Sequence, residues 1–259
     1  MNFRSIFAAS AALLLSSAAA NAAQVAALIG GDTIAMVDTA QKKATGSVKV
    51  TGISGALVGI DVRPADGLLY GLVDDGTIVT IAADGKATMK SKLDTMLAKG
   101  VAATVDFNPV ADRLRVMGAD GMNLRANVDD GKVTKDGDHK YADGDMHKGE
   151  KPNIVAGAYI NSVKGAKETA LFNIDGTADA LVKQAPPNDG VLGSIGKLGV
   201  KADKASFDIW SDGSGKNEAW MMLGDTLYSV DLASGKATEA AKISGVSGTV
   251  RDIAILPAM

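Results

Sequence analysis

The sequence predicts an all-β fold, a single β-propeller of five four-stranded blades. Three observations predict it. Residues 32–52 return near the other end of the chain as residues 225–245, with 10 of the 21 aligned positions identical. Five apolar segments with the alternation of β-strands recur along the chain, and Asp-Gly or Ser-Gly turns follow them. Repeats of about 20 to 50 residues are typical of propellers, solenoids and arrays.

The chain begins with the pattern of a secretory leader. Arg4 supplies a positive charge, residues 6–19 are apolar, and small residues follow up to Ala22. Such leaders are removed on export, so we expect a signal peptide at residues 1–22 and a propeller domain at residues 23–259. Cleavage near Ala22 implies a secreted or periplasmic bacterial protein. No later run approaches about 18 apolar residues, so no membrane span is expected.

The composition excludes several classes of site. The 259 residues include no cysteine, which rules out disulfides, thiolate metal sites and cysteine nucleophiles. The net charge of −3 comes with no basic block, so nucleic-acid binding is not expected. The partner indicated by the composition is a small molecule or another protein.

Each repeat unit is predicted to begin with an inner strand that ends in Pro or Ser. These strands alternate with period 2, as half-buried strands do. Measured between their last residues, neighbouring strands are 45, 53, 49 and 46 residues apart. The five segments are residues 57–64, 102–109, 155–162, 204–211 and 250–257.

Three further short strands are predicted after each of the first four inner strands. In the second unit they fall within residues 113–118, 122–128 and 131–137. Asp-Gly between alternating apolar runs is a strong hairpin signal, and it occurs at Asp75-Gly76 and Asp84-Gly85. Four antiparallel strands in about 47 residues match one propeller blade.

The two ends of the chain are predicted to share a blade. Residues 25–51 supply outer strands with no inner strand before them, whereas residues 249–257 supply an inner strand with nothing after it. Closing the ring in this way pairs the edges that both segments would otherwise expose. The alternative is a solenoid, but its end repeats should be polar caps.

One inner-strand position carries aspartate in three of the five units. Asp61, Asp106 and Asp208 occupy it, and Asp252 lies two residues before it in the last unit. Carboxylates that meet at a channel axis need a cation or hydrogen-bond donors. A Ca²⁺-like ion with oxygen ligands is one solution, and backbone or side-chain donors of the next blade are the other. The displaced Asp252 argues against a symmetric metal ring. The metal candidates are Asp61, Asp106, Asp208 and Asp252.

A second set of polar residues is a candidate ligand site. Some of them lie two residues after the aspartate position, and others alternate with apolar residues along the second unit. Arginine can bind a carboxylate or phosphate with two hydrogen bonds, but it can equally form salt bridges with nearby residues such as Asp106 and Asp112. The candidate ligand-binding residues are Arg63, Asn108, Arg115, Asn123, Arg125, Asn161 and Trp210.

Two loops are distinctive. Residues 136–150 contain both histidines, His139 and His147, together with several carboxylates. Their spacing matches neither a calcium loop nor a zinc helix, so we expect an exposed, charged loop between blades. Residues 184–190, QAPPNDG, predict a rigid turn near the channel rim.

The chain resembles the uncharacterised bacterial domain-of-unknown-function family 4394. The resemblance rests on LVGIDVRPADGLLYGL, VDFNPVADRLRVMGADGMNLRANVDDG, PNIVAGAYINS, ALFNID and QAPPNDGVLGSIGKLGV, in the same order. It implies an exported, propeller-like protein and brings no activity with it. It also implies that Asp106, Asn108, Arg113, Arg115, Asn123 and Arg125 belong to a family pattern.

Three functional hypotheses remain open on the sequence. The first is a non-enzymatic module that binds a ligand or partner at a channel mouth. The second is a hydrolase or lactonase that depends on a Ca²⁺-like metal at the same mouth. The third is a structural component of the envelope or matrix. Both histidines lie in one loop and no nucleophile elbow accompanies them, which favours a role other than nucleophilic catalysis.

Overall fold

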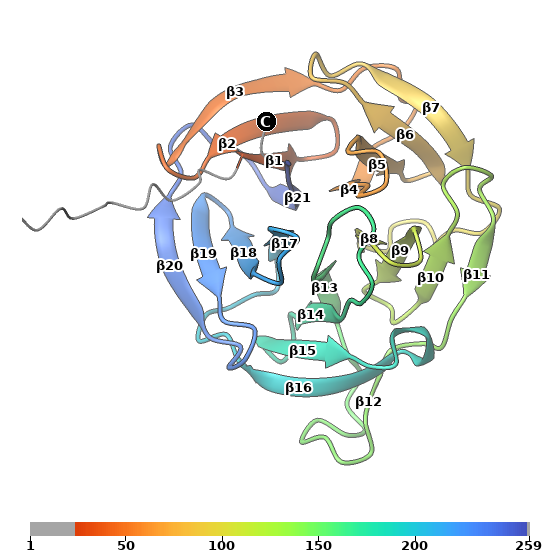
Figure 1. Cartoon of the computed structure of the whole chain (residues 1–259), viewed down its shortest axis with the longest axis vertical. Coiled ribbons are helices and arrows are strands. Elements are labelled where there is room, and N and C mark those ends of the chain that lie inside the picture. The colour runs from red at the N-terminus through yellow and green to blue at the C-terminus, as the bar shows by residue number, and fades with distance from the viewer. Residues whose placement is uncertain (1–23, 258–259) are drawn as a thin grey trace, which may run out of the picture.

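The computed structural model describes residues 24–257, which form five small β-sheets around one axis (Figure 1). Four sheets have four strands and one has five. The predicted all-β propeller of five blades is therefore confirmed. The predicted leader and its cleavage site lie outside the described residues. Within residues 24–257, no helix is long and apolar enough to cross a membrane.

Blade 1 combines strands from both ends of the described chain. From the axis outward its strands are β21 (Val250–Ile255), β1 (Gln24–Ile29), β2 (Thr33–Asp38) and β3 (Lys43–Lys49). β21 and β1 pair antiparallel, with Ala254 opposite Ala26. The ring is thus closed by N-terminal outer strands and a C-terminal inner strand, as the repeat predicts. The repeated segment is the outer half of blades 1 and 5.

Blades 2, 3 and 5 are antiparallel meanders that run outward from the axis. Blade 2 consists of β4 (Leu57–Val62), β5 (Leu69–Val73), β6 (Thr77–Ile81) and β7 (Ala87–Lys92). Blade 3 consists of β8 (Ala103–Asn108), β9 (Arg113–Gly118), β10 (Asn123–Ala126) and β11 (Val133–Lys135). Blade 5 consists of β17 (Ser206–Ser211), β18 (Asn217–Leu223), β19 (Thr226–Val230) and β20 (Ala237–Lys242).

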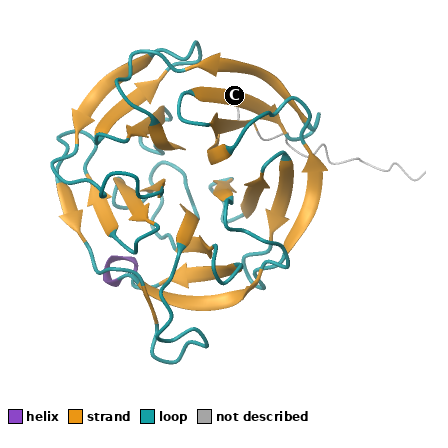
Figure 2. Ribbon diagram, turned by 180° about the vertical axis from the view of Figure 1, so that it is seen from behind, coloured by secondary structure: helices purple, strands orange, loops and turns teal. Residues whose placement is uncertain are grey.

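Blade 4 departs from the regular plan by one extra strand. Its meander is β13 (Ile154–Tyr159), β14 (Leu171–Asp175), β15 (Ala180–Gln184) and β16 (Val191–Lys197). A short strand from the preceding loop, β12 (Lys140–Tyr141), pairs parallel with β16. Most of the loop at residues 136–150 is exposed, as expected, but His139 and Tyr141 are buried within it. The short helix η1 (Pro187–Asp189) lies at the outer edge of the ring (Figure 2).

Burial decreases from the axis outward. All six residues of β4 are buried, whereas β3 is largely exposed. The inner strands therefore carry near-continuous apolar runs and the outer strands carry Lys, Thr and Ser. The connecting turns rely on glycine where the chain takes a positive φ. Gly76 and Gly85, in the two Asp-Gly turns named above, have φ of 84° and 83°, which glycine adopts at little cost.

The hydrophobic core lies between neighbouring blades. Separate apolar clusters fill the junctions of blades 1 and 2, blades 2 and 3, blades 4 and 5, and blades 5 and 1. The junction of blades 3 and 4 differs, because Met117 is the one buried blade 3 residue in its apolar cluster. Arg115 and Asn123, both fully buried, occupy much of that junction instead. Each blade is thus held by its neighbours on both faces, which places the inner strands firmly around the channel.

Candidate ligand site in the central channel

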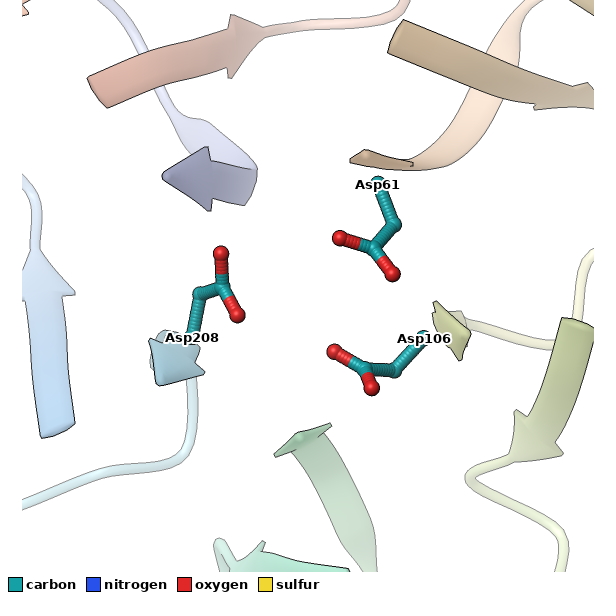
Figure 3. A group of neighbouring side chains, drawn as sticks. All are labelled: Asp61, Asp106 and Asp208. Atoms are coloured by element: carbon teal, nitrogen blue, oxygen red, sulfur yellow. The ribbon is translucent and has the colours of Figure 1, made fainter. Parts of the chain in front are cut away.

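Three of the four candidate aspartates meet at the channel axis. Asp61, Asp106 and Asp208 project from the inner strands β4, β8 and β17 toward one another (Figure 3). Each offers a carboxylate oxygen that lies within 4.8 Å of the other two. All three side chains are buried. The inner-strand register read from the sequence therefore brings together residues that are more than 40 positions apart in the chain.

Each channel aspartate also joins two blades. Asp61 Oδ2 accepts a hydrogen bond from the Phe107 amide at 2.6 Å, and Asp106 Oδ1 accepts one from Tyr159 at 2.9 Å. In each case the donor is the backbone of the next blade's inner strand. The other two such bonds, at 2.6 and 3.0 Å, run to Asp208 Oδ2 from Ile255 and to Asp252 Oδ2 from Ile60. We call these four contacts the aspartate clasps.

A second backbone bond supports three of the four clasps. The remaining oxygens of Asp61, Asp208 and Asp252 accept from the amide of the residue that follows each on its own strand. These amides belong to inner strands, whose channel-facing edge has no neighbouring strand. The carboxylates therefore satisfy buried backbone donors that would otherwise lack a partner. Of the two solutions expected from the sequence, hydrogen bonding to the next blade is present.

Burial and mutual repulsion raise the pKa values of the channel carboxyls. Burial is the main cause for Asp61 and Asp106, and the charge of a neighbouring aspartate adds to it. Burial also raises the pKa of Asp208 to about 6 and the pKa of Asp252 well above its usual value. The backbone hydrogen bonds act in the opposite direction, since they stabilise the ionised form.

Asp252 takes part in a clasp but not in the group at the axis. Only Asp61, Asp106 and Asp208 bring their oxygens within 4.8 Å of one another. Asp252 lies two residues earlier on its strand than the aligned position. It accepts a hydrogen bond from the backbone amide of Ile60, one residue before Asp61. Both ends of this clasp are thus shifted along the channel. The displacement read from the sequence is present in the structure.

A cavity of about 540 Å³ opens at one mouth of the channel. Asp61 and Asp208 lie at its inner end, and the segments after the inner strands of blades 1, 2, 4 and 5 form its walls. Its lining residues are Asp61, Val62, Pro64, Gly67, Ser162, Val163, Lys164, Asp208, Ile209, Trp210, Ser211, Asp212, Ile255, Leu256 and Pro257. The cavity is therefore continuous with the carboxylates at the axis.

Two of the predicted ligand-binding residues lie at this mouth. Trp210 lines the cavity, and the ammonium of Lys216 lies 5.8 Å from the centre of its ring. Asn161 directly precedes the lining segment and has a positive φ of 57°, a conformation that asparagine tolerates. Its backbone amide donates to Asn217 Oδ1 of the next blade, and its side-chain Oδ1 accepts a hydrogen bond from Asn217 Nδ2.

Arg63 lies near the mouth but is occupied by carboxylates of its own protein. It forms ion pairs with Asp112 at 2.6 Å and with Asp129 at 2.9 Å. Both partners belong to blade 3, so Arg63 connects blades 2 and 3. These pairs hold the pKa of Arg63 above its usual value. Arg63 is not among the residues that line the cavity.

The polar residues of the second unit form a buried network between blades 3 and 4. Arg115 donates to Asp136 at 2.6 Å, to Asn188 and to the Tyr159 hydroxyl. Arg125 also pairs with Asp136, and Asn123 donates to two backbone carbonyls near η1. The salt bridges foreseen in the sequence are present. Arg115 and Arg125 pair with Asp136 rather than with Asp106 or Asp112, and Asp112 pairs with Arg63 instead. Asn108 accepts two backbone bonds in its own turn.

Several cavity residues were not among the site residues predicted from the sequence. Ser162, Val163 and Lys164 follow β13, and Leu256 and Pro257 follow β21. Only the arrangement of the blades brings these short segments together. The proline and serine that end each inner strand were the available hint, since they mark where the chain leaves the channel.

A model of the family described as Domain of unknown function (DUF4394) matches residues 33–254. None of the curated proteins matches the chain. The family match thus covers most of the chain and runs through all five blades.

Solved structures match the chain at low sequence identity. A protein of unknown function from Bacteroides caccae is 11% identical, with a TM-score of 0.46, over 92% of this chain and all of that chain. A structural genomics protein from Bacteroides thetaiotaomicron is 14% identical, with a TM-score of 0.49, over 81% of this chain and 54% of that chain. Myxococcus xanthus glutaminyl cyclase is 15% identical, with a TM-score of 0.46, over 73% of this chain and 76% of that chain. At these identities the likeness assigns no activity.

Proposed function

Because this chain belongs to the family of the domain of unknown function DUF4394, whose description assigns no activity, we propose its function from the geometry of its channel. The protein is an exported binding module. It holds a small ligand in the cavity at one mouth of the channel and performs no chemical step on it.

The observation that carries this proposal is the cavity itself. Its volume of about 540 Å³ falls within the range of roughly 300 to 1,000 Å³ for small-molecule sites. Like such sites, it combines apolar walls with a few polar groups at its inner end. The apolar walls come from residues such as Val163, Ile255 and Pro257, and the polar groups are the carboxylates of Asp61 and Asp208.

The lining residues support binding rather than nucleophilic catalysis. Two serines, Ser162 and Ser211, line the cavity, but no histidine does. Ser211 donates its hydroxyl hydrogen bond to Asn217, and it accepts one from the Ser162 amide. A serine nucleophile needs a base within hydrogen-bond reach, and these contacts use Ser211 for fixing the wall of the cavity.

Thermal-shift screening tests the proposal. Purified mature protein is screened against a panel of periplasmic metabolites. Compounds that bind are tested again with Val163→Trp, because Val163 is a half-buried residue of the cavity wall and a tryptophan there would fill the cavity. We expect at least one compound to raise the melting temperature of the wild type but not of the variant. Met89→Trp, on the exposed face of β7, is the matched control and should respond like the wild type. Compounds that raise the melting temperatures of Val163→Trp and Met89→Trp equally would contradict a site in the cavity.

A second candidate, a hydrolase or lactonase that depends on a Ca²⁺-like ion, is favoured by one observation. The oxygens of Asp61, Asp106 and Asp208 lie within 4.8 Å of one another, and Ca²⁺ binds oxygens at about 2.3 to 2.6 Å. Three protein oxygens would leave the remaining positions to water and substrate. Elemental analysis of the purified protein tests this candidate. Stoichiometric calcium together with a melting temperature lowered by EDTA would support it, and metal-free protein that is indifferent to EDTA would exclude it.

Export is part of the proposal and has its own test. The basic and apolar pattern of residues 1–22 supports it. Fractionation of the source bacterium with N-terminal sequencing should find a soluble periplasmic or secreted chain that begins near residue 23. Recovery in the insoluble envelope would instead favour a structural component of the envelope or matrix.

A further inference from the structure

The channel carboxylates have no cationic partner within the described chain. Asp61, Asp106 and Asp208 are all buried, and none of them appears in an ion pair among residues 24–257. Asp136, the buried aspartate between blades 3 and 4, shows the usual arrangement, since Arg115 and Arg125 both pair with it. Buried charges are normally paired in this way or coordinate a metal. The axis therefore holds acidic groups that lack a positive counterpart.

The three carboxylates have a spacing that suits a primary ammonium group. An –NH₃⁺ group has three donors, and acceptors at hydrogen-bond distance from such a tetrahedral nitrogen lie about 4.7 Å apart. The oxygens of Asp61, Asp106 and Asp208 lie within 4.8 Å of one another. Two of the three residues line the cavity, so an ammonium group can reach them from the mouth.

The wall above the carboxylates also favours a positive charge. Trp210 lines the cavity, and aromatic rings attract cations at distances up to about 6 Å. The Lys216 ammonium, 5.8 Å from the ring centre, already makes such a contact and adds a positive charge beside this wall. Asp212 adds a third carboxylate at the rim. Lys164 is the one basic residue among the lining side chains.

An unused polar group lies deeper in the channel. Thr104 is two residues before Asp106 on β8, so strand alternation places both side chains on the same face. It is 2% exposed, and its hydroxyl has no hydrogen-bond partner among the described residues. Buried hydroxyls are normally satisfied by protein or water. The Thr104 hydroxyl is thus free to bond a ligand or water that enters this part of the channel.

We propose that the cavity binds a small organic cation, whose primary ammonium group sits on Asp61, Asp106 and Asp208 and whose carbon chain lies along Trp210. The inference rests on the proposed function and names the class of its ligand. The ammonium enters from the mouth, lies between the carboxylates, and donates one hydrogen bond to each. Trp210 and the apolar ends of β17 and β21 cover the carbon chain.

Titration calorimetry with three molecules of one carbon skeleton tests this ligand class. The probes are hexylamine, 1-hexanol and sodium hexanoate, with the mature protein at low ionic strength. We expect hexylamine to bind with 1:1 stoichiometry and at least about tenfold more tightly than either other probe. Calcium chloride is the fourth titrant and should bind more weakly than hexylamine or compete with it. Tighter binding of hexanol or hexanoate than of hexylamine would overturn the proposal.

Three variants locate the bound amine. Asp208→Asn should weaken hexylamine binding at least about tenfold, because it removes one of the charges under the ammonium. Lys164→Gln should strengthen it about threefold, since it removes a like charge from the wall. Asp84→Asn, on an exposed turn between β6 and β7, is the control and should change nothing. Asp208 also forms a clasp, so Lys164→Gln keeps the test valid if Asp208→Asn does not fold.

The outcomes separate this inference from the proposed function. Competition between hexylamine and a hit from the metabolite panel supports both. A panel hit that binds in the cavity while hexylamine does not leaves the binding function intact and overturns the cationic ligand. Binding of hexylamine that is unchanged in Lys164→Gln and Asp208→Asn places the amine elsewhere and also overturns it.

Discussion

Four of the five blade junctions carry an aspartate clasp, and the junction of blades 4 and 5 does not. At the four clasped junctions an inner-strand carboxylate reaches the backbone of the next inner strand. At the fifth, β13 faces β17 (Figure 1) and the aligned residue is Tyr159. Its hydroxyl turns instead toward Arg115 of blade 3. The inner strands of blades 4 and 5 therefore meet without a shared buried charge.

Other contacts hold the fifth junction. A large apolar cluster fills the space between blades 4 and 5, with Phe172, Phe207 and Ile209 among its members. At the mouth, the Asn161 amide donates to Asn217 at 2.8 Å, and the Ser162 amide donates to Ser211 at 2.9 Å. These polar contacts are only partly buried. The junction thus depends on apolar packing inside and on neutral hydrogen bonds at its rim.

The unclasped junction forms one side of the cavity. The clasps close four sides of the ring with groups buried at the axis. The unclasped junction supplies Ser162, Val163 and Lys164 from one blade and Ser211 and Asp212 from the other to the wall of the cavity. The rest of the wall comes from blades 1 and 2, so the cavity spans both the unclasped junction and the clasped junction of blades 5 and 1.

Removing the displaced clasp should have the largest effect. Asp252→Ala leaves two buried amides, those of Ile60 and Ile253, without their acceptor. Each unsatisfied buried donor costs about 1 to 3 kcal/mol, and Asp252 lies outside the group at the axis, so little repulsion is relieved. We expect the free energy of unfolding in urea to fall by about 3 kcal/mol.

The control for this variant is an aspartate that accepts a backbone bond at the surface. Asp84 accepts the exposed amide of Lys86, and Asp84→Ala should cost about 0.5 kcal/mol or less. Equal losses in the two variants would show that the clasps contribute no more than an ordinary turn, and the distinction between clasped and unclasped junctions would then fail.

How much of this arrangement the sequence reveals differs between the ring and the site. The recurring apolar runs at residues 57–64 and their four counterparts were enough to place every inner strand, because strands buried on both faces carry nearly continuous apolar residues. The repeat in residues 225–245 also placed the closing blade. Asp61, Asp106 and Asp208 could be assigned to one level because strand register is periodic.

The rest depends on contacts that a sequence pattern does not encode. The partner of Arg115 proved to be Asp136, which lies in a loop 21 residues away, whereas the sequence suggested nearer carboxylates. His139 looked like part of an exposed loop, yet β12 carries it against blade 4, where burial lowers its pKa to about 4. The cavity joins four segments from four blades. Loop positions in space decide all three features, and periodicity says nothing about them.

Stability should fall as the pH rises from about 4.5 to 7.5, by about 2 kcal/mol in total. The channel carboxyls have pKa values raised in the fold, to about 6 for Asp208. A carboxyl whose pKa is raised in the fold contributes its full stabilisation below the pKa that it has in the unfolded chain. This contribution is lost as the pH rises through the pKa of the folded state. Asp61, Asp106 and Asp252 act in the same direction. Urea unfolding at several pH values measures the slope.

One buried group opposes this slope. The lowered pKa of His139, about 4 in the fold, means that its contribution is lost as the pH falls from about 6.5 toward 4. The pKa shift of His139 is about as large as that of Asp208, so the raised pKa values of Asp61, Asp106 and Asp252 give the net slope its sign. Asp75 and Asp129, with pKa values near 2, lose their contributions only below about pH 4. A stability that rises steadily from pH 4.5 to 7.5 would contradict the crowding of charge at the axis.

Weakening the rim of the unclasped junction should have a smaller effect. Asn217→Ala removes the acceptor of the Asn161 amide and a partner of Ser211. Since these groups are only partly buried, water replaces the lost bonds, and we expect a loss of about 1 kcal/mol. Hydrogen exchange should quicken at residues 161 and 162 and stay unchanged at Phe107, on the clasped side. Equal quickening on both sides would show that the two kinds of junction open together.

The smallest effect should come from Asp106→Asn, and its sign is informative. Asp106 accepts a single bond, from the Tyr159 amide through Oδ1, and asparagine keeps an oxygen for that role. The new side-chain amide can donate to Asp61 or Asp208, whose oxygens lie within 4.8 Å. At pH 7.5 the variant should therefore be more stable than the wild type by up to about 1 kcal/mol, because one crowded carboxyl has been removed. At pH 4.5, where protonation of the carboxyls already relieves the crowding, the gain in stability should vanish.

A loss of stability at pH 7.5 as large as that of Asp252→Ala would contradict this account. It would mean that an unseen cation balances the carboxylates, and the clasp would then have to be treated as part of an ion site.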